Sequence, residues 1–302
     1  MIGVLRNPAN GRQTLESAAA IKGRSLWDDA GRRLMRNRAA VAGMEVLALL
    51  LTAAILGPML IPFRYDQIGK NDVWDLPLVG GHLLGTDSLG RDLLARLLIG
   101  LRVSLAIGVV ATAVSLVIGV AWGATAGYVG GQLDELMMRI VDVLYSLPFI
   151  FFVILLMVTF GRSLIILFLA IGAVEWLTMS RIVRGQTVAL KQKEFIEAAR
   201  AAGLTTPAII ARHIIPNLLG PVVIYVTLTI PSVILAESFL SFLGMGVQEP
   251  LTSLGTLIAN GAEERDLAPW LLIFPSVVMV AALMSFNFIG DGLRDAIDPK
   301  DR

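Results

Sequence analysis

Six stretches of the chain are apolar over roughly the 20 residues that a helix needs to cross a bilayer. They cover residues 39–63, 103–126, 143–160, 163–180, 218–244 and 268–290. The polar segments between them do not show the alternation, over about ten residues, that is typical of a membrane-spanning β-strand. The pattern therefore predicts an all-α, polytopic membrane protein with six transmembrane helices.

Composition supports this class and narrows the possible chemistry. Hydrophobic residues occupy 56% of the 302 positions and charged residues only 16%, whereas soluble domains carry about 25% charged residues. The chain has no cysteine and two histidines, which excludes a disulfide framework, a thiolate zinc site and a cysteine nucleophile. We therefore expect neither a metal site nor a cofactor bound by this chain.

The distribution of Lys and Arg predicts the orientation of the helices. Of the 25 basic residues, 18 fall in the two terminal segments, at position 139 and within 181–217, and seven fall in the alternate segments. Because basic residues accumulate on the cytoplasmic side of a membrane, both termini are expected in the cytoplasm. The first apolar stretch begins only at residue 39, so we expect a permanent helix rather than a cleaved signal.

The polar segments divide the chain into regions. We expect a cytoplasmic tail with an interfacial amphipathic helix, a first transmembrane helix, a periplasmic segment, a five-helix core with a cytoplasmic loop, and a cytoplasmic C-terminal tail. Their bounds are 1–38, 39–63, 64–102, 103–290 with the loop at 186–217, and 291–302. Ser25 is placed to cap the N-terminal helix, and Asp87 or Ser88 to cap a second surface-lying helix in the periplasmic segment.

The cytoplasmic loop predicts two short helices joined by a turn. Residues 191–202 are good helix formers, and Gly203 is placed to end that helix in a left-handed conformation. Thr206 is the expected N-cap of the second helix, with Pro207 at its first position and Pro216 ending or kinking it. From the residues alone, such a unit either rests on the helix bundle or docks against a partner.

The loop also resembles a known motif. Glu197–Ala199 are followed by Gly203 and then by His213–Pro216, an arrangement similar to the EAA loop of binding-protein-dependent ABC importers. Further segments resemble the C-type permease subunits of oligopeptide importers, in the OppBC subfamily; they are residues 82–92, 127–142, 237–244 and 290–300. The resemblance begins at about residue 23 and departs from the common pattern where His213 replaces an aliphatic residue.

This resemblance implies a six-helix permease with the type I ABC importer fold in a bacterial inner membrane. Its implied protein partners are a similar B-type permease, two ABC ATPase subunits that use Mg-ATP and a periplasmic peptide-binding protein. The implied substrate is an oligopeptide, and no nucleic acid is expected to bind. The resemblance also implies which residues couple the permease to the ATPase: Glu197, Ala198, Ala199, Gly203, Thr206, Pro207, His213 and Pro216. A dipeptide or nickel permease of the same family and, in a different class, a proton-coupled secondary transporter are the alternatives.

Three carboxylates lie inside the expected spans: Glu45, Glu175 and Glu237. A carboxylate in a membrane is costly, so each is a candidate for function or for packing against protein. Glu237, with the nearby Ser238 and Ser241, is the strongest candidate for lining a translocation path.

Two further patterns concern packing and energy supply. Gly119, Gly123 and Gly127 recur at four-residue spacing, which allows two helix backbones to approach closely within a membrane. The chain lacks a phosphate-binding P-loop motif. It is therefore not expected to be an enzyme, and ATP hydrolysis is expected in partner subunits.

Overall fold

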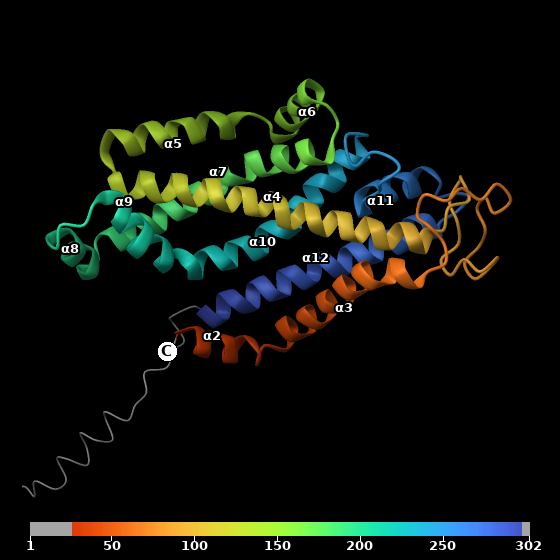
Figure 1. Ribbon diagram of the computed structural model, residues 1–302, viewed down its shortest axis with the longest axis horizontal. Helices are drawn as coiled ribbons and strands as arrows, with labels where there is room; N and C mark the ends of the chain where they lie inside the picture. Colours follow the sequence, from red (N-terminus) through yellow and green to blue (C-terminus); the bar gives the residue numbers. More distant parts are fainter. Residues whose placement is uncertain (1–25, 298–302) are drawn as a thin grey trace, which may run out of the picture.

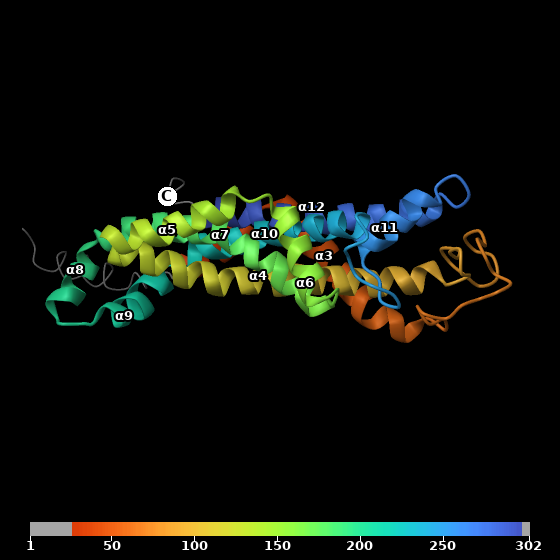
Figure 2. The ribbon, with the colours of Figure 1, turned by 90° about the horizontal axis from the view of Figure 1, so that it is seen from above.

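The structure, a computed structural model, describes residues 26–297, which form helices joined by loops with only two isolated β-bridges. The helices are α2 (Leu26–Leu34), α3 (Arg38–Leu60), α4 (Leu93–Val129), α5 (Gly131–Ser146), α6 (Phe149–Phe160), α7 (Leu164–Lys191), α8 (Glu194–Ala201), α9 (Thr206–Ile209), α10 (Ile215–Phe242), α11 (Leu254–Glu263) and α12 (Trp270–Ile297). A π-helical turn, η1 (Ile210–Ile214), joins α9 to α10. The long helices run side by side along the long axis of the molecule (Figure 1, Figure 2).

Five helical stretches are long and apolar enough to cross a membrane: α3, α4, α7, α12 and the continuous stretch from α9 to α10. The predicted third span is not one straight helix, because α5 and α6 meet at 86° and form a sixth span only as a bent pair. The break lies at Leu147, which is extended, and Pro148. Since proline disfavours helical conformation in the residue before it, the break follows from the local sequence.

The predicted surface-lying helix of the periplasmic segment is wrong. Neither Asp87 nor Ser88 begins a helix there; Asp92 is the N-cap, and the residues that follow belong to the single 37-residue helix α4. Arg102 made this stretch look like a polar boundary, but its guanidinium donates to the carbonyls of Ala54 and Ile55 in α3. Because that charge is satisfied within the bundle, the helix continues through it.

The glycine stripe of α4 packs against α7. A Cβ atom on Gly119 would lie 2.6 Å from the Met179 side chain, and one on Gly127 would lie 2.8 Å from the backbone oxygen of Arg184. Such separations leave no room for a side chain, so the predicted close approach of two helices is confirmed. α4 and α7 therefore form a tightly packed pair at the centre of the bundle.

The N-terminal helix is shorter than predicted. α2 ends at Leu34, and Asn37 caps α3 by accepting hydrogen bonds from the amides of Ala39 and Ala40. The predicted cap at Ser25 lies outside the described residues. Leu34 packs close to Gly292 of α12, which fixes the amphipathic helix to the end of the bundle.

The segments that connect the long helices gather at the two opposite ends of the molecule. α8 and α9 project at one end, whereas the loop 61–92 and α11 lie toward the other (Figure 1). One buried cluster lies under α8 and α9, and another joins α3, α4, α10, α11 and α12. Each end is thus attached to its own part of the hydrophobic core.

Candidate functional site

The turn after α8 has the hydrogen-bond pattern of a Schellman motif. The amide of Gly203 donates to the carbonyl of Arg200, and the amide of Leu204 donates to that of Ala199. Gly203 has a φ of +80°, the left-handed conformation that this motif requires and that glycine adopts most readily. The predicted helix end at Gly203 is confirmed.

Buried contacts attach α8 to the bundle. Ile196 is fully buried and Ala199 is nearly so, both in the cluster that contains Met179 and Val183 of α7. The Nε atom of Arg200 donates to the Tyr128 hydroxyl at 3.1 Å, at the end of α4. α8 therefore cannot shift without acting on α4 and α7.

The opposite face of α8 is open to solvent. Glu197 and Ala198 are exposed, as are Gly203, Thr206 and Pro207 in the turn that follows. Glu197 supplies a carboxylate on this face that can pair with a base, and Glu194 is exposed three positions before it. Unlike these residues, Ala199, which is also predicted to take part in coupling, is buried and packs against this protein's own helix bundle.

The structure corrects two details of the second short helix. The N-cap is Thr205 rather than Thr206, and its side chain makes no capping hydrogen bond. Pro216 does not end the helix, because it occupies the first turn of α10 directly after the π-helical turn η1. His213 lies in that turn, half-buried, so the irregular backbone precedes the proline. Single π-helical turns often mark functional sites.

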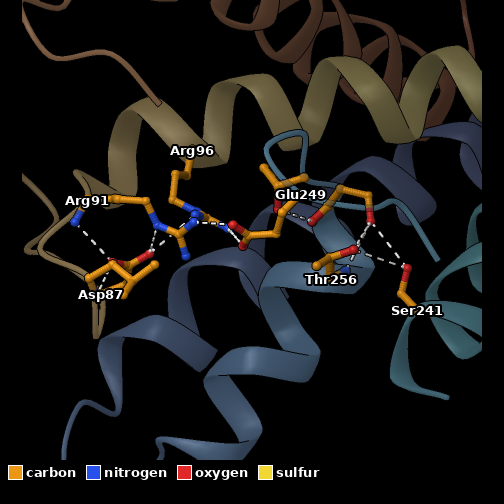
Figure 3. Close-up of polar contacts among 9 residues, drawn as sticks. Asp87, Arg91, Arg96, Ser241, Glu249 and Thr256 are labelled. Atoms are coloured by element: carbon orange, nitrogen blue, oxygen red, sulfur yellow. Dashed lines mark hydrogen bonds and ion pairs between the residues drawn. The ribbon is translucent and has the colours of Figure 1, made fainter. Parts of the chain in front are cut away.

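A charged network occupies the other end of the molecule. Glu249, in the loop after α10, points toward Arg91 and Arg96, while Asp87 lies on the far side of these two arginines (Figure 3). Arg91 lies 2.6 Å from Glu249 and 2.7 Å from Asp87, and Arg96 lies 3.4 Å from each carboxylate. Only 1% of the Arg96 side chain is exposed, so a buried cation depends on Glu249 and Asp87.

The two arginines set the ionisation of Glu249. Burial raises the pKa of this carboxyl, but the hydrogen bond and charge of Arg91, together with the charge of Arg96, outweigh burial and hold the pKa below its ordinary value. Glu249 therefore stays ionised at neutral pH and holds its loop against the N-terminal end of α4.

We expect Glu249→Gln to destabilise the protein at pH 7 by about 1 kcal/mol. The effect is modest because half of the Glu249 side chain is exposed, so solvent screens its ion pairs with the two arginines. Since the folded pKa is lowered, this stabilisation is present above the ordinary carboxyl pKa and is lost as pH falls through the folded value. Thermal unfolding in detergent should separate the two proteins at pH 7, and the difference should shrink progressively as the pH is lowered below the ordinary carboxyl pKa of about 4.3. A difference that persists in acid would assign the effect to packing.

The predicted path residue Glu237 lies inside the subunit. Its side chain is 0% exposed, and its Oε1 atom accepts hydrogen bonds of 2.6 Å from the hydroxyls of Ser241 and Ser253. Ser253 also accepts from the amide of Thr256 and so caps α11. Figure 3 shows Ser241 and Thr256 in this second polar group, beside the charged network. The carboxylate therefore joins α10 to α11 rather than facing an open surface.

Ser238, the third predicted path residue, is half-buried and donates to the carbonyl of Ile234 in its own helix. Of the other carboxylates within spans, Glu45 is exposed on α3 and Glu175 is half-buried on α7. Within residues 26–297, no three acidic or histidine side chains are arranged to hold a metal ion.

We expect Glu237→Leu to lower stability by about 1–3 kcal/mol, because the hydroxyls of Ser241 and Ser253 would lose their acceptor while buried. Glu237→Gln keeps an acceptor oxygen and should retain most of the stability. Thermal unfolding of the detergent-solubilised protein measures both. If Gln also leaves uptake unchanged across pH 6–8, the residue serves packing; a changed uptake would favour the path role.

Sequence reasoning missed a second group of charges, between α5 and α7. Arg184 of α7 holds Asp134 of α5 through two hydrogen bonds, of 2.6 and 2.7 Å, and Arg181 holds Asp142 at 2.7 Å. These residues line an open cavity of about 540 Å³. The acids recur on one helix and the bases on another, but nothing local in the sequence pairs them.

Comparisons with known proteins agree with this architecture. Residues 117–302 match the family described as "Binding-protein-dependent transport system inner membrane component", which is more than half of the chain. The chain belongs to this family. Residues 25–77 match a second model, the N-terminal TM domain of oligopeptide transport permease C.

Similar curated proteins are permeases of this family. The chain is 54% identical over 294 residues to the oligopeptide transport system permease protein OppC of Escherichia coli K12, covering 96% of this chain and 97% of the relative. It is 52% identical to the OppC protein of Haemophilus influenzae, covering 93% and 91%. The dipeptide transport system permease protein DppC of Bacillus subtilis is 42% identical, covering 92% and 87%.

Two thirds of the chain have a fold similar to that of a chain in a solved structure of the MetNI methionine ABC transporter, which is described as inward-facing. The TM-score is 0.54 at 22% identity, covering 67% of this chain and 96% of that one. The chain is therefore a multi-pass membrane permease with the fold of ABC importers.

Proposed function

We propose that the chain is one permease half of an ATP-driven importer that takes up oligopeptides across a bacterial inner membrane. Its partners are a similar B-type permease, two ATPase subunits and a periplasmic peptide-binding protein. Oligopeptides, rather than dipeptides or nickel, are favoured by the 54% identity to an oligopeptide permease and by the match of residues 25–77 to permease C.

The observation that carries the proposal is the two-sided character of α8. One face is anchored by Ile196 and Arg200 to α4 and α7, and the other exposes Glu197 and Ala198. An exposed face that carries the Glu197 carboxylate suits a groove on a partner protein that offers a base. Displacement of such a helix by an ATPase would act on the long helices and favour one of two orientations of the permease.

The energy for transport is proposed to come from the partners. The chain has no phosphate-binding P-loop motif, so we propose that Mg-ATP binds only to the ATPase subunits and that this chain performs no catalysis. Its residues contribute half of the translocation path and the contact through which hydrolysis is coupled to uptake.

Co-purification tests this function. The chain, expressed with the proteins encoded beside it, should bring down an ATPase, and Glu197→Lys should weaken that association because it reverses the exposed charge. Glu194→Lys, which reverses a neighbouring exposed charge outside the EAA motif, is the matched control. Uptake of labelled oligopeptide by proteoliposomes should require ATP on the side of the membrane where the ATPase subunits lie. Uptake that survives without ATP but collapses with the proton gradient would refute the proposal.

A further inference from the structure

The contact between α5 and α7 is unusual in this bundle because charged pairs contribute much of it. Only Val141 of the sixteen residues of α5 is buried. The Asp134 side chain is 13% exposed and is held by both nitrogens of the Arg184 fork. The Arg181 guanidinium pairs with Asp142 and lies 4.3 Å from the centre of the Tyr145 ring. The bidentate Asp134–Arg184 pair adds geometric specificity to the contact between the two helices, whereas the Asp142–Arg181 pair has one hydrogen bond and is more exposed.

The basic partners lie on the helix that leads directly into the exposed helix α8. Only Gln192 and Lys193 separate α7 from α8. Ile196 of α8 and Val183 of α7 share one buried cluster. A displacement of α8 is therefore passed to the stretch of α7 that carries Arg181 and Arg184.

The acidic partners lie on the helix that ends at the sharpest bend in the chain. α5 stops at Ser146, and α6 leaves at 86°. α6 rests on another part of the bundle, where Val153 and Met157 are buried in a cluster with Leu167 of α7. α5 and α6 are thus held separately. The charged pairs and the buried contact of Val141 with Trp176 and Leu177 of α7 hold α5, and a different apolar cluster holds α6.

We propose that the Asp134–Arg184 and Asp142–Arg181 pairs are positioning contacts that make α5 follow α7, so that displacement of α8 changes the angle at Leu147–Pro148. This inference rests on the proposed coupling role of α8. Loss of the pairs should then lower the amount of peptide transported per ATP hydrolysed. Assembly of the transporter and ATP hydrolysis should be retained, because they need only the exposed face of α8.

The chain supplies a matched control. Arg139 and Glu135 form a third pair beside the other two, but both lie on α5 and both are more than 70% exposed. Removing this pair changes charge in the same cavity without disconnecting two helices. Asp134→Asn, Arg184→Gln and the swap Asp134→Arg with Arg184→Asp are therefore compared with Glu135→Gln combined with Arg139→Gln.

The complete transporter in proteoliposomes gives the first readout. Asp134→Asn and Arg184→Gln should lower labelled peptide transported per ATP by at least about fivefold, the lower end of typical coupling between sites. The swap should recover part of this ratio, and the control pair should match the wild type. Wild-type ratios in both single variants would overturn the proposal, as would equal losses of hydrolysis and uptake or failure to assemble with no recovery in the swap.

A distance measurement gives the second readout. Because the chain has no cysteine, spin labels can be attached to cysteines introduced at exposed Leu136 of α5 and exposed Phe151 of α6. The separation should change between nucleotide-free and vanadate-trapped wild-type transporter, and Asp134→Asn should abolish the change. A change that persists in Asp134→Asn overturns this inference alone. Absence of any change in the wild type, with no co-purifying ATPase, would instead overturn the proposed function and this inference with it.

Discussion

Gly203→Val should leave a transporter that hydrolyses ATP but takes up peptide about tenfold more slowly. The φ of +80° at Gly203 costs an ordinary L-residue about 1–2 kcal/mol, and each 1.4 kcal/mol corresponds to about a tenfold shift in population. A Cβ at this position would meet no other atom within 4 Å. The effect of valine therefore comes from backbone strain alone, relieved when the Schellman hydrogen bonds open and α8 shifts.

Two comparisons isolate this cause. Gly203→Asn should be close to the wild type, since asparagine tolerates the left-handed region. Gly185→Val, on α7, also meets no atom within 4 Å and has an ordinary helical backbone, so it should transport normally. Uptake and hydrolysis measured together on the reconstituted complex decide the matter. Normal peptide transport per ATP in Gly203→Val would show that the turn has no part in coupling.

Gly123→Leu should strongly lower the thermal unfolding midpoint of the protein. A Cβ on Gly123 would collide with the carbonyl oxygen of Ser180 and lie 2.9 Å from the amide nitrogen of Arg184. Both are backbone atoms of α7, which cannot rotate away as a side chain can. Overpacking of this kind costs about 1–3 kcal/mol and occasionally more, and here the whole contact between α4 and α7 would have to separate.

The thermal unfolding midpoint of detergent-solubilised protein measures this effect. Gly123→Ala introduces the same Cβ and should already lower the midpoint, with leucine lowering it further. Gly185→Leu is the control, because it adds the same side chain to α7 in open space. An unchanged midpoint in Gly123→Leu would mean that α4 and α7 are not as closely packed as described.

Features that depend on a few adjacent residues could be predicted from the sequence. The left-handed turn at Gly203 follows from a glycine behind a run of helix formers. The break before α6 also depends on one local residue, Pro148, although the predicted span 143–160 ran through it. The apolar stretches located the long helices for the same reason. Each depends on interactions within one turn of helix or on the length of an apolar segment.

Features that depend on distant partners could not be predicted. The sequence suggested a boundary at Arg102, but the helix continues because the carbonyls of Ala54 and Ile55, in another helix, accept hydrogen bonds from that guanidinium. Glu237 looked like a path residue because nothing local indicated that Ser253 would cover it. The register between Asp134 and Arg184 likewise exists only once α5 and α7 are side by side.

The length of α4 has a thermodynamic consequence. At about 1.5 Å per residue, its 37 residues form a strut longer than the roughly 30 Å hydrocarbon core. At one end of α4, Arg200 donates a hydrogen bond to Tyr128, and at the other end Arg96 donates one to Glu249. If binding at one end biases the position of the strut, reciprocity requires that occupancy of the other end bias it equally. A protein docked outside and a nucleotide bound inside would then change each other's affinity by the same factor, without ever being in contact.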